Sequence, residues 1–187
     1  TGNMLVEKMN SLRKIFNGTD MLIAAHYEDQ ETIKNNIEKY KQKYKGADDI
    51  PVSAHPSIRS VPACYASSEL AVRLAKIAGA RLHILHVSTA KELQLFSDEP
   101  LANKNITAEA CVAHLLFTLT HYNSLGARIK CNPAVKRKTD REALRTAVNS
   151  GLIGVIATDH APHLLSEKEG GALEAMSGMP MIQFSLV

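Results

Sequence analysis

The stretch GVIATDHAPH, residues 154–163, decides the fold of this chain. Its apolar run ends abruptly in an acid, two histidines and a proline. Continuous apolar runs of this kind are typical of a strand that is buried on both faces of a parallel sheet. Asp159 then follows the strand at its carboxyl end, where α/β barrels place their chemical groups. The stretch therefore predicts an α/β protein with a functional site at the carboxyl edge of its sheet.

Two earlier apolar runs end in histidine in the same way. MLIAAH (21–26) ends at His26, and LHILH (82–86) ends at His86. Because the carboxyl ends of parallel strands meet at one edge of a sheet, we expect His26, His86 and Asp159 to form one site. A single histidine at a strand end is more often a hydrogen-bonded structural residue than a ligand. Two imidazoles and a carboxylate together favour a divalent metal, with zinc as the expected ion.

Strands and helices alternate along the chain. The expected strands cover residues 21–26, 80–87, 104–109 and 152–158. The expected helices begin after Asp29, at Ser67 or Ser68, near residue 110, and at Thr139 or Asp140. Four strands form either a small doubly wound sheet or about half of a (β/α)8 barrel, which typically needs about 250 residues. No GxGxxG motif follows a strand, so a dinucleotide-binding fold has no support.

We therefore expect a partial (β/α)8 TIM-type barrel, about strands 5 to 8, that forms a single domain over residues 1–187. A zinc enzyme uses three or four protein ligands and keeps one position open. The chain offers two histidines, His26 and His86, and one aspartate, Asp159. Since at least one further ligand is needed, we expect the chain to be a segment of a longer protein.

Composition and charge exclude several classes of protein. The chain of 187 residues is 45% hydrophobic and 22% charged, which is ordinary for a globular protein with a sizeable core. Its net charge of +3 is small and its basic residues are scattered, which gives no case for nucleic acid. No apolar stretch approaches the ~20 residues that span a membrane. Three widely spaced cysteines argue against a disulfide framework, so we expect a reducing, cytoplasmic location.

Four further residues are weaker candidates for contacts with a substrate. Asn132 precedes a proline, where its amide could hold a carboxylate or a ring amide, or could simply form an Asx turn. His163 could donate to an anionic substrate or could be an ordinary loop histidine. His55 and Arg59 lie in a long proline-containing connection and are weaker candidates still.

Short motifs that occur together in one family are spread over nearly the whole chain. They are AHYED (25–29), LHVST (85–89), ITAE (106–109), NP (132–133), TDHAPH (158–163), EKE (167–169) and SGMP (177–180). Together they resemble the dihydroorotases of the amidohydrolase superfamily. The most specific motif is TDHAPH, because the related hydantoinases and allantoinases usually vary the residues after its Asp-His pair.

The resemblance implies a (β/α)8 barrel with a zinc centre, which holds two ions in the complete protein. His26 and His86 would be the histidine ligands of one metal. Asp159 would be a metal-bound aspartate that acts as general base and general acid. The resemblance thus gives the three strand-end residues distinct roles in a hydrolase.

The resemblance also implies a substrate. Asn132 and His163 would bind it, and the backbone near Gly178 would touch its pyrimidine ring. The reaction would be the reversible conversion of dihydroorotate and N-carbamoyl-L-aspartate in de novo pyrimidine biosynthesis. The expected partners are this small molecule and, as an open alternative, a second copy of the chain in a homodimer, with no nucleic acid and no membrane.

Some features of the family are missing. The His-x-His-x-Arg motif and the bridging carboxylated lysine or aspartate are absent, and residues 1–4 resemble the segment that follows the bridging ligand. We therefore expect the segment to be inactive alone. Two alternatives are a hydantoinase- or allantoinase-type hydrolase and an inactive dihydroorotase-like scaffold partner of a carbamoyltransferase. The presence of His26, His86 and Asp159 counts against the scaffold.

Overall fold

The computed structural model describes residues 6, 8–26, 28–46 and 50–184. Residues 1–4, which resemble a family segment, lie outside the described residues, as does Tyr27 of the AHYED motif. In the part of the chain that is described, no helix is both long and apolar enough to cross a bilayer.

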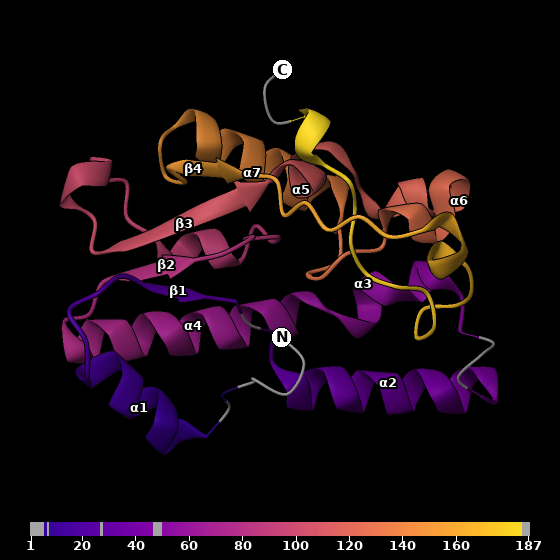
Figure 1. Ribbon diagram of the computed structural model, residues 1–187, viewed down its shortest axis with the longest axis horizontal. Coiled ribbons are helices and arrows are strands. Elements are labelled where there is room, and N and C mark those ends of the chain that lie inside the picture. Colours follow the sequence, from indigo (N-terminus) through magenta and orange to yellow (C-terminus); the bar gives the residue numbers. More distant parts are fainter. Residues whose placement is uncertain (1–5, 7, 27, 47–49, 185–187) are drawn as a thin grey trace.

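A parallel sheet of four strands lies at the centre of the structure (Figure 1). Its strands are β1 (Ile23–Ala25), β2 (Leu82–Ile84), β3 (Ile106–Cys111) and β4 (Val155–Ala157). They lie side by side in the order in which they occur in the chain, and each neighbouring pair is parallel. The carboxyl ends of all four strands therefore meet at one edge, as the sequence predicts.

Helices from both halves of the chain share one apolar core with a single face of this sheet. The α-helices are α1 (Met9–Asn17), α2 (Gln30–Tyr44), α3 (His55–Ile58), α4 (Val61–Ala78), α5 (Val112–Leu116), α6 (Tyr122–Leu125) and α7 (Lys138–Asn149). Short 3-10 helices cover Val52–Ala54, Glu92–Leu95, Leu101–Asn103, Leu119–His121, Gly126–Ile129, Leu165–Lys168 and Ile182–Phe184. Helix α4 contacts β2, α5 contacts β3, and α7 packs on α5.

The largest apolar core lies between the sheet and its helices. Leu82 and Ile84 of β2 pack there with Leu12 and Phe16 of α1 and with Leu144 of α7. Leu82 and Ile84 on one face of β2 are buried, whereas His83 on the other face is only partly buried. The sheet is parallel as predicted, but β4 is not buried on both faces, because Ile156 is 54% exposed on this edge strand.

Two smaller cores lie beyond the main one. One joins α5 and α6 to Met179 and Met181. The other joins α2 and α3 to Ala172. The C-terminal segment after β4 therefore packs against both groups of helices and connects them.

Two helix ends follow local signals in the sequence. Asp29 caps α2 as predicted, because its Oδ2 accepts a hydrogen bond from the backbone nitrogen of Thr32 at 2.8 Å. Gly79 ends α4 as predicted, in the left-handed conformation with φ 65°.

The predicted start of α4 at Ser67 or Ser68 is wrong. The helix begins at Val61, six residues earlier than Ser67, with Pro62 in its first turn. Proline suits this position because the first turn needs no backbone donor. Ser67 lies inside the helix, where its hydroxyl donates to backbone carbonyls of the preceding turn.

Leu82→Ala should lower the free energy of unfolding by about 2–5 kcal/mol, because it opens a cavity in the main core. Urea denaturation of the folded protein measures this change. Ile77→Ala is the matched control: Ile77 is 75% exposed on α4, so its loss should cost less than about 0.5 kcal/mol. Equal effects of the two substitutions would contradict the assignment of the core.

Candidate metal and substrate site

The side chains of His26 and His86 meet at the carboxyl edge of the sheet. His26 directly follows β1, and His86 lies two residues beyond the end of β2. The Nδ1 atom of His26 contacts the Nε2 atom of His86. Their ring centroids are 4.5 Å apart and the rings are nearly perpendicular, at 83°. Two imidazole nitrogens from neighbouring strands therefore converge on one point.

The environment keeps both rings neutral. Burial, together with a smaller effect of the neighbouring His26, lowers the pKa of His86 to about 3. Loss of hydration also lowers the pKa of His26, although Glu28 and Asp159 oppose this shift. Neutral imidazole is the form that binds metal ions.

Asp159 follows β4 at the same edge of the sheet. It adopts a left-handed conformation with φ 46°, which is uncommon for a residue other than glycine. The residue is exposed, but partial loss of hydration raises the pKa of its carboxyl group. The nearby His26 opposes this rise in pKa, whereas Glu109 adds to it. His26 and Asp159 are thus within electrostatic reach of each other.

The three predicted ligands do not form a complete cluster. His26 and His86 are in contact, whereas Asp159 interacts with His26 only through its charge. Within the described ranges, no group of three or more histidine, cysteine, aspartate or glutamate side chains is arranged to hold a metal ion. The metal-binding role of these residues stays a prediction.

Glu109 of β3 supports the backbone at His86. Its Oε1 accepts a hydrogen bond from the backbone nitrogen of His86 at 3.2 Å, and its Oε2 lies 3.2 Å from Nε2 of His83. His86 has φ 40°, and such left-handed residues persist where their surroundings hold them in place. The sequence marks Glu109 as the last residue of the ITAE motif and as an acid in an otherwise mostly apolar strand, but neither signal indicates this supporting role.

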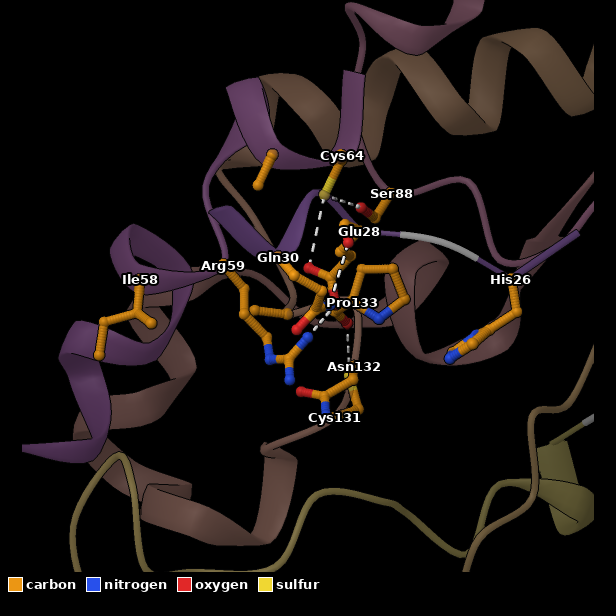
Figure 2. Close-up of polar contacts among 12 residues, drawn as sticks. His26, Glu28, Gln30, Ile58, Arg59, Cys64, Ser88, Cys131, Asn132 and Pro133 are labelled. Carbon is orange, nitrogen blue, oxygen red and sulfur yellow. Dashed lines mark hydrogen bonds and ion pairs between the residues drawn. The ribbon is translucent and has the colours of Figure 1, made fainter. Parts of the chain in front are cut away.

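A network of polar contacts around the ion pair of Glu28 and Arg59 connects the loops that follow the two histidines. Glu28, two residues after the histidine of β1, accepts a hydrogen bond from Nη1 of Arg59. Cys64 of α4 lies 3.8 Å from the other carboxylate oxygen and accepts a hydrogen bond from Ser88 at 3.6 Å. Figure 2 shows Glu28 between Cys64 and Arg59. This network links both histidine loops to α4.

Asn132 lies next to a buried histidine from the connection between α2 and α4. The Asn132–Pro133 peptide bond is cis, and the side chain of Asn132 is half-buried. The Nε2 atom of His55 lies 3.0 Å from the carbonyl oxygen of Cys131 and 3.1 Å from Oδ1 of Asn132. The structure thus joins two residues that the sequence offered only as separate, weak candidates.

His163 and Gly178 lie together in the C-terminal segment. The Nε2 atom of His163 donates to the carbonyl of Ser177 at 3.1 Å, and the backbone nitrogen of Gly178 donates to the carbonyl of Lys130 at 2.8 Å. Gly178 has φ 149°, and an added Cβ would lie 2.4 Å from the carbonyl oxygen of Ala161. Only glycine fits this position.

Lys168 holds this segment against the loop that contains Asn132. Its ammonium group donates to the carbonyls of Lys130, Met176 and Gly178 at 3.0, 2.7 and 2.8 Å. The lysine belongs to the EKE motif, but its type and spacing give no sign of this role.

Comparisons with known proteins agree with the motifs. No protein-family model matches the chain. A dihydroorotase from Halalkalibacterium halodurans is 34% identical over 178 residues, which are 94% of this chain and 39% of the relative. A dihydroorotase from Bacillus caldolyticus is 33% identical over 162 residues, 86% of this chain and 36% of the relative. The chain resembles dihydroorotases. It spans between a third and two fifths of the length of these relatives.

Solved structures support the fold. A D-hydantoinase from Thermus sp. has a TM-score of 0.85 at 16% identity and covers 98% of this chain and 41% of its own. An L-hydantoinase from Arthrobacter aurescens has a TM-score of 0.83 at 23% identity, and the match covers 95% of this chain and 40% of the hydantoinase. A dihydroorotase from Saccharomyces cerevisiae has a TM-score of 0.56 at 19% identity, and the match covers 63% of this chain and 34% of the dihydroorotase. The predicted fold, a partial α/β barrel, is therefore confirmed.

Arg59→Ala should lower the free energy of unfolding by up to about 3 kcal/mol, because it leaves the buried Glu28 carboxylate without its partner. Denaturant unfolding measures the loss. The double variant Arg59→Ala with Glu28→Gln should recover part of it, since no unpaired charge remains buried. If the double variant had a still lower free energy of unfolding than Arg59→Ala, the ion pair would not be what stabilises this region.

Proposed function

We propose that this chain is the segment of a metal-dependent cyclic amidohydrolase that supplies two histidine ligands and the catalytic carboxylate. The complete enzyme converts dihydroorotate and N-carbamoyl-L-aspartate reversibly, as in de novo pyrimidine biosynthesis. The observation that supports this most is the convergence of His26 Nδ1 and His86 Nε2 at the strand ends. It occurs in a chain that is 34% identical to a dihydroorotase over 94% of its length.

The residues present fit part of a zinc centre. Two neutral imidazole nitrogens that converge from neighbouring strands suit one divalent ion. The described part of the chain offers no third ligand in the same cluster. We therefore assign His26, His86 and Asp159 to a centre of two zinc ions whose remaining ligands lie outside this sequence. When bound, the metal polarises the amide carbonyl of the substrate.

Asp159 is the proposed general base and general acid. In ring opening, its carboxylate takes a proton from the attacking water and then gives that proton to the ring nitrogen as the C–N bond breaks. Ring closure runs through the same groups in reverse. A carboxylate whose pKa is raised toward neutrality serves both steps better than an ordinary one.

The substrate contacts follow from the resemblance and from the placement of the loops. Asn132 and His163 are assigned to the substrate, and the backbone near Gly178 to its pyrimidine ring. The Lys168 contacts support this grouping, because they hold the loop at residue 130 next to Gly178. The side chain of Asn132 is only partly buried, so solvent can reach it.

Cellular context and assembly are part of the same proposal. All three cysteines, Cys64, Cys111 and Cys131, are free thiols, as expected in the reducing cytoplasm. A homodimer is the assembly that we propose. The segment alone should be inactive, because its sheet places β1 and β4 at the two edges and its ligand set is incomplete.

Two other functions compete with this proposal. The structural likeness to hydantoinases favours a hydrolase of another cyclic amide. An inactive scaffold partner of a carbamoyltransferase is the alternative outside the enzymes. The substrate that the complete protein hydrolyses distinguishes the first alternative from a dihydroorotase. Its metal content distinguishes the inactive scaffold from an enzyme.

Turnover of dihydroorotate by the complete natural protein that contains this segment tests the proposal. Treatment with a chelator should abolish turnover, and zinc should restore it. Bound zinc without turnover of dihydroorotate would favour hydantoin or allantoin as substrate. Absence of both metal and activity would favour the scaffold.

Asp159→Asn should lower kcat by about a thousandfold or more, because the amide cannot accept the proton. Zinc content, measured by atomic absorption, should remain largely unchanged. Asp98→Asn is the matched control, since Asp98 is exposed on a loop, and its kcat should match that of the unaltered protein. Near-normal turnover in the Asp159 variant would remove this residue from the mechanism.

A further inference from the structure

We propose that His55 is a positioning residue that fixes the orientation of the Asn132 side-chain amide, so that its NH2 group faces the substrate. This inference rests on the proposed function, in which Asn132 contacts the substrate. His55 itself is 3% exposed and acts through Asn132. It comes from a different part of the chain, at the first residue of α3.

The hydrogen-bond partners of His55 determine which ring nitrogen bears the hydrogen. Nε2 lies 3.0 Å from the backbone carbonyl oxygen of Cys131. A carbonyl oxygen can only accept, so Nε2 of His55 is the donor. Burial lowers the pKa of His55 to about 3, against the opposing effect of the bond to Cys131, so the ring is neutral at neutral pH and Nδ1 bears no hydrogen.

The same donor decides how the amide of Asn132 is oriented. An amide has one oxygen that accepts and one nitrogen that donates, and a rotation of its plane exchanges them. The atom 3.1 Å from Nε2 of His55 must be the acceptor Oδ1, because two donors would oppose each other. Nδ2 therefore points away from His55, and the part of the chain that the structure describes gives it no protein acceptor.

This orientation narrows what Asn132 can recognise. An amide that is free to rotate could bind either a carbonyl oxygen or a ring N–H. With Oδ1 directed at His55, Asn132 presents its N–H donors on the opposite side of the amide, and these match the carboxylate or a ring carbonyl of dihydroorotate. A ligand that presents an N–H at this position would leave donors facing each other, and a site of this kind rejects such analogues strongly.

A matched pair of substitutions isolates the donor of His55. Met and Gln have similar lengths, but only Gln offers an N–H to Asn132. In the complete zinc-loaded protein, His55→Met should raise the KM for dihydroorotate about tenfold, the factor that corresponds to one oriented hydrogen bond, with a smaller change in kcat. His55→Gln should restore the KM to within about threefold of the unaltered protein. Zinc content should be equal in all variants.

A double-variant cycle separates positioning from a general structural role. Asn132→Ala should raise the KM at least as much as His55→Met does. Once Asn132 is absent, His55→Met should have no further effect on the KM. Equal effects of His55→Met with and without Asn132 would overturn the inference, as would a failure of His55→Gln to restore the KM.

A further variant keeps the test decisive if His55→Met does not fold. Asn132→Asp can still accept the hydrogen bond from His55 but cannot donate to the substrate, so its KM should rise as in Asn132→Ala. A normal KM for Asn132→Asp would overturn the inference. Absence of turnover in the unaltered zinc-loaded protein would overturn the proposed function and this inference with it, whereas turnover with additive effects would overturn the inference alone.

Discussion

The parallel pairing of four short strands is the constraint on which the candidate site depends. Parallel strands end at one edge, so residues from widely separated parts of the chain meet there without any local contact between them. His26 and His86 are 60 residues apart in sequence, yet their rings touch. If one strand were displaced by a single residue, its side chains would point to the opposite face of the sheet.

The strand ends are not relaxed backbone. His86 and Asp159 both adopt left-handed conformations that favour glycine. Each lies two residues beyond the end of a strand. Neighbouring groups must therefore hold them, and Glu109 does so for His86 through a side-chain hydrogen bond from the adjacent strand. The positions of the candidate ligands thus depend on neighbouring residues at the carboxyl edge of the sheet, and not on the histidines alone.

The sequence predicts those features that depend on local patterns. Apolar runs with polar ends locate the strands and place His26, His86 and Asp159 at one edge, and Asp29 and Gly79 mark helix ends. The contact of His55 with Asn132 joins residues 77 positions apart, and no periodicity encodes it. The ion pair of Glu28 and Arg59 was missed for the same reason, because it depends on how a connection folds back over the strand ends. The start of α4 is not predicted correctly because serine is a common helix cap and two serines lie within this helix, whereas Pro62 marks its actual first turn.

The contacts of Lys168 have a consequence for motion at the site. One ammonium group joins the carbonyl before Cys131 to two carbonyls of the C-terminal segment and so acts as a non-covalent cross-link. The loop that presents Asn132 and the segment around Gly178 are therefore tied together by hydrogen bonds. An opening at Asn132 must either carry the C-terminal segment with it or break the contacts of Lys168 and the backbone bond from Gly178 to Lys130. A partly buried lysine outside the ligand set thereby becomes a determinant of how fast the site exchanges its contents.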